Sequence, residues 1–105
     1  MSTARQSDAS KASVTLENDL TIYNVQTQKT QLMEVLCANT VVELDLAQVR
    51  EIDTSGIQLL ILIKRESLRL GHTLRIVAHS PAVHATMDFL DLGSYFGDPL
   101  VIKAR

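Results

Sequence analysis

The stretch VVELDLAQVREIDTSGIQLLILI, residues 41–63, decides the fold. Its first six residues, Val41 to Leu46, are rich in β-formers and predict a largely buried strand. A long helix is expected from about Ser55 to Leu70, and Gly71 suits a left-handed cap at its end. Because a buried strand leads within a few residues into a long helix, the stretch predicts an α/β domain built from strand–helix–strand units.

The flanking sequence extends this pattern in both directions. Upstream, two short alternating runs, 14–16 and 20–22, surround Asn18-Asp19 and predict a hairpin, and Asn24 can cap a helix to about Ala38. Downstream, we expect a strand over 73–78, a helix from Ser80-Pro81 to about Asp91, and a short edge strand over 99–103. The order predicts a mixed sheet of four to five strands with helices packed mainly on one face. Residues 1–12 are expected to form a flexible tail, and 13–105 a single domain.

The composition excludes several classes of function. Ten Lys and Arg stand against twelve Asp and Glu, and aromatic residues make up only 4%. The chain therefore lacks the positive charge and the stacking side chains that nucleic-acid binding requires. Cys37 is the sole cysteine, so no disulfide framework or cysteine zinc site is expected. No stretch reads as a membrane span or signal peptide, which predicts a cytoplasmic protein without direct membrane insertion.

The tetrapeptide Asp53-Thr54-Ser55-Gly56 is the candidate site, because it lies where a strand region gives way to a long helix. Exposed backbone N–H groups and the positive end of the helix dipole meet there. Asp53 can order the turn by accepting N–H groups, and Gly56 leaves the Ser55 hydroxyl unshielded. A phosphate on Ser55 would add about −1.5 to −2 charges. The helix N–H groups alone would then be expected to stabilise it, without Lys or Arg.

Two alternatives remain open at this site. Ser55 and Gln58 fit a capping box, so Ser55 can simply cap the helix, which contributes about 1 kcal/mol. The helix is also apolar nearly all round in its first two turns, with Leu62 toward the polar side and Ile61 at its margin. It is either buried more completely than usual, or it docks a partner through Gln58, Leu62 and Ile61 beside Ser55.

Catalytic and metal chemistry find little support in the residues. Asp45 and Asp53 offer too few oxygen donors for a hard cation. Nothing places a histidine beside Ser55, so no hydrolytic triad can be assembled. We therefore expect a protein that is not an enzyme and that has no cofactor, no catalytic residue and no metal.

The segments Leu44-Asp45-Leu46 and Ile52-Asp53-Thr54-Ser55-Gly56-Ile57 resemble the STAS domain of bacterial anti-sigma factor antagonists. The resemblance extends over about residues 14–102. It implies a sheet with helices on one face and a phosphorylatable residue at the helix start. By position that residue is Ser55, with Thr54 as second choice. Asp53, Gly56 and Asp45 match the residues that support the site.

The resemblance also implies a partner switch. Stand-alone members bind a serine kinase of the anti-sigma factor type, an ATPase, and are released when it phosphorylates the serine. A metal-dependent serine phosphatase restores binding, and the output is regulation of transcription. Here the helix continues Ile57-Gln58-Leu59-Leu60, a departure that leaves the partner open between sigma-factor, chemotaxis and biofilm regulators. The alternative is a STAS subunit of a lipid-transport ABC ATPase, which docks without phosphorylation.

Overall fold

The computed structural model describes residues 10–92. Six elements follow one another in this range: β1 (Lys11–Thr15), α1 (Val25–Ala38), β2 (Val41–Leu46), α2 (Thr54–Leu70), β3 (Thr73–His79) and α3 (Pro81–Phe89). The predicted bounds of β2 and the ends of α1 and α2 are confirmed. Ser80 caps α3 as expected, since its side chain accepts the N–H of Val83 at 3.1 Å. Lys11 and Ala12 belong to β1 and not to the tail in which we expected them.

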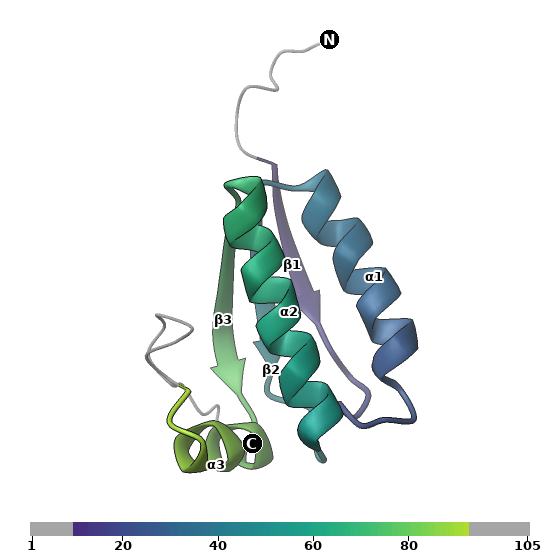
Figure 1. Ribbon diagram of the computed structural model, residues 1–105, viewed down its shortest axis with the longest axis vertical. Helices are drawn as coiled ribbons and strands as arrows, with labels where there is room; N and C mark the ends of the chain where they lie inside the picture. Colours follow the sequence, from purple (N-terminus) through teal and green to yellow (C-terminus); the bar gives the residue numbers. More distant parts are fainter. Residues whose placement is uncertain (1–9, 93–105) are drawn as a thin grey trace, which may run out of the picture.

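The three strands form a parallel sheet in the order β1-β2-β3, with β2 at the centre. One face of the sheet is covered by α1 and α2, which run side by side and in the same direction (Figure 1). Helix α3 lies beyond the carboxyl ends of the strands. This arrangement brings the start of α2 and the whole of α3 to the same end of the domain.

The core lies between the sheet and the two long helices. Every second residue of β2 and β3 is buried, which is the alternation of a sheet with one covered face. On the opposite face, Glu43 of β2 pairs with Lys11 at 3.3 Å and with Arg75 at 2.8 Å. The core cluster includes Leu32, Leu36, Val42, Leu44, Leu46, Leu60, Ile63, Leu74 and Ile76.

The predicted N-terminal hairpin is wrong. β1 pairs in parallel with β2, and Leu20 makes only an isolated parallel bridge with Ile52. The physical reason is Asp19, whose Oδ1 accepts the N–H groups of Arg50 and Glu51 at 3.1 Å each. Asn18-Asp19 therefore joins a distant loop, and it does not form the local turn that its composition suggested.

The predicted sheet is correct in part. All the strand pairs among residues 10–92 are parallel, so the described sheet is not mixed, and it has three strands. The strand expected over 99–103 lies outside the described residues. Between residues 10 and 92, no helix combines the length and the apolar character that crossing a membrane would need.

Candidate functional site

Asp53 builds the start of α2. Its Oδ1 accepts the N–H of Gly56 at 3.2 Å, which makes Asp53 the N-cap. Its Oδ2 accepts the N–H of Ile22 at 3.0 Å, so the same carboxylate also fastens the segment that precedes α1. The Ile22 hydrogen bond, followed by that of Gly56, lowers the pKa of Asp53 against the opposing effect of burial. An ionised carboxylate is therefore fixed at this helix end.

Ser55 is not the cap. It is the second residue of α2, it is half-buried, and its hydroxyl has no hydrogen bond to any residue between 10 and 92. The capping interpretation of Ser55 is wrong, because α2 begins earlier, at Thr54, and the side chain of Asp53 accepts the N–H of Gly56 as its cap. Thr54, the second choice for modification, is the first helical residue and is exposed.

Gly56 has a different role from the one we expected. It is buried, and a Cβ at this position would stand 2.7 Å from the Cβ of Leu20 and closer still to the Leu20 carbonyl oxygen. The glycine therefore permits close packing of the Leu20 backbone on α2. The expectation that it uncovers the Ser55 hydroxyl is wrong, because its missing side chain points into the fold.

The helix amides are also less available than we expected. The Gly56 N–H is bound to Asp53, and the Ser55 N–H contributes to lowering the pKa of the same carboxylate. A phosphate on Ser55 would thus meet amides already engaged by an anion. The expectation that these amides suffice without a cation stays a prediction, and they would have to be shared with the carboxylate of Asp53.

Asp45 lies in β2 and makes a different contact from that of Asp53. Its Oδ1 accepts the N–H of Ala47 at 2.8 Å, so the carboxylate orders the turn that leaves β2. It does not line any of the three grooves described below. Residues 10–92 contain no group of three or more His, Cys, Asp or Glu side chains placed to hold a metal ion.

Three grooves surround the start of α2. The first, of about 610 Å³, lies between α2 and α3 and is lined by Thr54, Ile57 and Phe89 among others. The second, of about 590 Å³, shares Asp53 with the first and extends to Tyr23. The third, of about 270 Å³, lies between α1 and α2, and we call it the Ser55 hollow. It is lined by Ile22, Val25, Gln26, Lys29, Ser55, Gln58, Leu59 and Leu62.

Exposed apolar side chains frame these grooves. Of six large hydrophobic residues exposed in the described chain, four line them. They are Ile22, Tyr23, Phe89 and Leu90, with exposed fractions of 61%, 91%, 87% and 46%, and we call them the apolar rim. Sequence reasoning missed them, although the consecutive pair Ile22-Tyr23 directly before a helix start was a usable signal.

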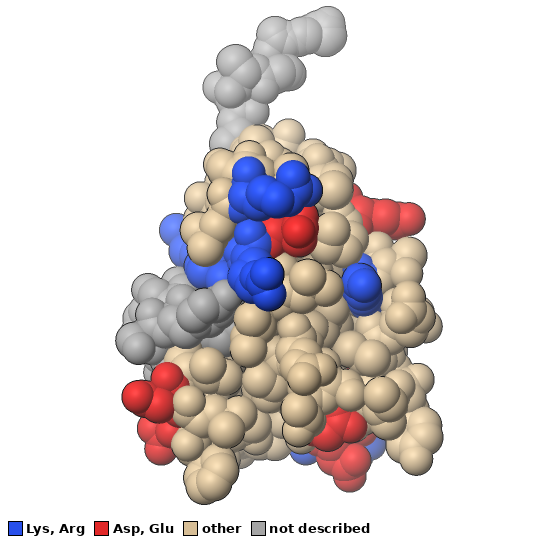
Figure 2. Space-filling view, viewed as in Figure 1, with Lys and Arg blue, Asp and Glu red and all other residues tan. Residues whose placement is uncertain are grey.

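The surface over α2 is divided by charge. Residues 54–63 include no charged side chain, whereas Lys64, Arg65, Glu66 and Arg69 follow. Figure 2 shows the result: uncharged surface over the first half of the helix, with basic groups gathered over its second half. Of the predicted docking residues, Gln58 is exposed and Leu62 half-buried, and both line the Ser55 hollow. Ile61 is half-buried and packs against the core.

Comparison with known proteins gives the fold and the family. The structure resembles that of the anti-sigma factor antagonist SpoIIAA in its unphosphorylated form, with a TM-score of 0.67 and 18% identity over 88% of this chain and 83% of that one. It also resembles a sulfate transporter family protein from Wolinella succinogenes, with a TM-score of 0.65 and 16% identity over 83% and 71% of the two chains. No curated protein matches the chain. Residues 3–102 match the family described as "Mlab, STAS domain", so this chain belongs to the STAS domain family.

Proposed function

We propose that this protein is a non-enzymatic partner-switching module. An ATPase of the serine kinase and anti-sigma factor type docks on the start of α2, and phosphorylation of Ser55 by that kinase releases it. A metal-dependent serine phosphatase resets the switch. The likeness to an anti-sigma factor antagonist supports the choice of partner class.

One observation carries the proposal: the Ser55 hydroxyl has no hydrogen bond within residues 10–92, and Ser55 lines the Ser55 hollow together with the exposed Ile22 of the apolar rim. Covering an apolar surface of this kind with a partner removes it from water, which lowers the free energy of the complex. A phosphate placed there adds about −1.5 to −2 charges, which must lose water when the partner docks. Docking and phosphorylation therefore oppose each other at the same place.

The switch does not require the domain to refold. Asp53, and not Ser55, holds the helix start, so modifying the serine leaves that hydrogen bond in place. An acidic group in the first turn also interacts favourably with the helix dipole. Ser55→Asp is therefore expected to keep a Tm close to that of the wild type while it weakens partner binding.

The experiment uses the ATPase that co-purifies with the full chain from its own organism. The pair is incubated with ATP and the phosphate is mapped by mass spectrometry, where labelling of residues other than Ser55 or Thr54 counts against the mechanism. Affinity is then measured for Ser55→Asp, for Ser55→Ala and for Gln31→Glu, which adds the same charge on an exposed part of α1 away from the grooves. We expect about tenfold weaker binding for Ser55→Asp alone. Equal affinity of Ser55→Asp and Ser55→Ala would refute the switch.

A second candidate function uses the same docking surface but does not involve phosphorylation. The matched family is described as Mlab and not as an anti-sigma factor antagonist, which favours the subunit role in a lipid-transport ABC ATPase that the resemblance also allowed. In that case an ATPase co-purifies together with a membrane permease, and incubation with ATP leaves Ser55 unmodified. The same purification therefore separates the two functions.

A further inference from the structure

Phosphorylated Ser55 faces an electrostatic conflict, and this inference deepens the proposed function. The carboxylate of Asp53, two residues earlier, is held ionised by the N–H groups of Ile22 and Gly56. The Gly56 N–H that Asp53 holds is one of the helix-start amides that a second anion would otherwise use. A phosphate on Ser55 therefore lies near a negative charge, and a cation from another part of the chain would stabilise it.

The Ser55 hollow supplies one. Of the eight residues that line it, Lys29 is the only charged one, and the others are apolar or carry uncharged polar groups. Lys29 lies one turn into α1, which runs beside α2 in the same direction (Figure 1). The hollow is small, about 270 Å³, so groups attached to its walls lie within a few residue lengths of each other.

The ammonium of Lys29 is also available for a new ion pair. Its side chain is exposed, and within residues 10–92 its ammonium makes neither an ion pair nor a hydrogen bond. By contrast, Lys64 donates to the carbonyl of Leu74 at 3.1 Å, and Arg69 pairs with Glu66 at 2.8 Å. A lysine combines a compact charge with a flexible stem, which suits it to follow a phosphate that appears and disappears.

We propose that Lys29 is the counter-ion of the phosphate on Ser55. Phosphorylation then has two effects at once. It places a dianion in the Ser55 hollow, which Ile22 of the apolar rim also lines, and it draws the ammonium of Lys29 across the hollow from α1 toward α2. In the unphosphorylated protein the same ammonium stays free at the edge of the docking surface.

The test places phosphoserine at position 55 of the full chain by genetic code expansion, so that no kinase is needed. The second protonation of the phosphate, near pH 6, is followed by ³¹P NMR in the wild type, in Lys29→Ala, in Lys29→Arg and in Arg65→Ala. Arg65→Ala is the matched control, because Arg65 is exposed, makes no ion pair in the described chain, and lies ten residues, about 15 Å, along α2 from Ser55.

A nearby cation favours the dianion, so its loss strengthens proton binding. We expect the phosphate to bind its proton about threefold more tightly in Lys29→Ala at low salt, and as in the wild type in Lys29→Arg. Arg65→Ala should change proton binding by much less. Equal titrations of Lys29→Ala and Arg65→Ala would overturn the assignment, as would an effect that Lys29→Arg does not restore.

This result is independent of whether a kinase modifies Ser55 in the cell. If the NMR titration shows that Lys29 pairs with the phosphate but the ATPase does not phosphorylate Ser55, the role of Lys29 stands and the partner switch is refuted. If the ATPase phosphorylates Ser55 but the titration shows no effect of Lys29, the partner switch stands and the role of Lys29 is refuted.

Discussion

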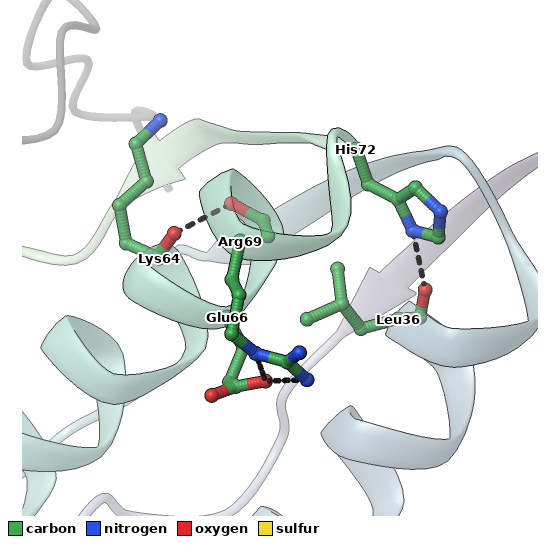
Figure 3. A network of polar contacts seen from close by, with 6 residues as sticks. Leu36, Lys64, Glu66, Arg69 and His72 are labelled. Carbon is green, nitrogen blue, oxygen red and sulfur yellow. Dashed lines mark hydrogen bonds and ion pairs between the residues drawn. The ribbon is translucent and has the colours of Figure 1, made fainter.

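The two ends of α2 are built in opposite ways. At the C-terminal end, Gly71 adopts φ +73° and its N–H donates to the carbonyl of Leu68 at 3.2 Å, while the N–H of His72 donates to that of Ser67 at 2.8 Å. More local contacts lie there: Arg69 pairs with Glu66 (Figure 3). The hydroxyl of Ser67 also donates to the carbonyl of Lys64 at 2.7 Å. Two longer contacts join this half of the helix to the rest of the domain, those of His72 with the carbonyl of Leu36 and of Lys64 with the carbonyl of Leu74, whereas the backbone cap itself is made by neighbouring residues.

At the N-terminal end, distant residues do the closing. Asp53 accepts from Ile22, 31 residues away, and Gly56 packs under the Leu20 backbone. The two halves of α2 also differ in charge. Residues 54–63, at the N-terminal end, include no charged side chain, whereas the half that ends at Gly71 carries four. The comparison shows that neighbouring residues are enough to end a helix, whereas the start of α2 is assembled from segments that are distant in the sequence. That start is the end where we propose that a partner docks.

Gly56→Ala should show the largest effect on stability. Alanine favours a helix over glycine by about 1 kcal/mol, yet its Cβ would overlap the backbone of Leu20. We expect a net loss of about 3 kcal/mol in the free energy of unfolding, measured by urea denaturation. A variant as stable as the wild type would show that the Leu20 segment yields easily, and it would remove the contrast between the two ends.

Gly71→Ala should cost less, about 1 kcal/mol in the same measurement. The residue has a left-handed conformation that L side chains adopt at a cost, but nothing lies within 4 Å of the added Cβ. Gly71→Asn is the control, because asparagine tolerates this conformation better and should recover part of the loss. A loss for Gly71→Ala that exceeds the loss for Gly56→Ala would reverse the proposed order.

Asp53→Asn tests the charge at the distant end. The folded pKa of Asp53 is lowered, so its stabilising effect is complete above the ordinary aspartate value of about 3.9 and is lost as pH falls through the lowered value. Asparagine keeps an acceptor oxygen but does not titrate. The fall in Tm between pH 5 and pH 2.5 should therefore be shallower in Asp53→Asn. Parallel curves would mean that this carboxylate does not contribute to acid sensitivity.

Arg69→Gln should have the smallest effect. The Arg69–Glu66 pair is exposed on the arginine side and spans a single helical turn. Solvent and salt screen such pairs, so the Tm at 0.15 M salt should match the wild type within error. A clear decrease that disappears at 1 M salt would show that the C-terminal end depends on charge more than its backbone hydrogen bonds suggest.

The sequence by itself determined the elements and the family. Periodicity located α1, β2, α2 and β3 almost to the residue. The end of α2 at Gly71 and the start of α3 at Ser80-Pro81 were also predictable, because such signals depend only on neighbouring residues in the chain. The motif around Ser55 identified the STAS family before any contact was known.

Only the tertiary structure decided how the site is made. Asn18-Asp19 reads as a local turn, yet Asp19 binds the loop at 50–51, and this turned an expected hairpin into a parallel pairing. The same segment brings Ile22 to Asp53 and Leu20 to Gly56, which gives the cap to Asp53 and frees Ser55. Local propensity covers a few neighbouring residues, whereas these contacts join groups about 30 residues apart whose meeting depends on the packing of the whole domain.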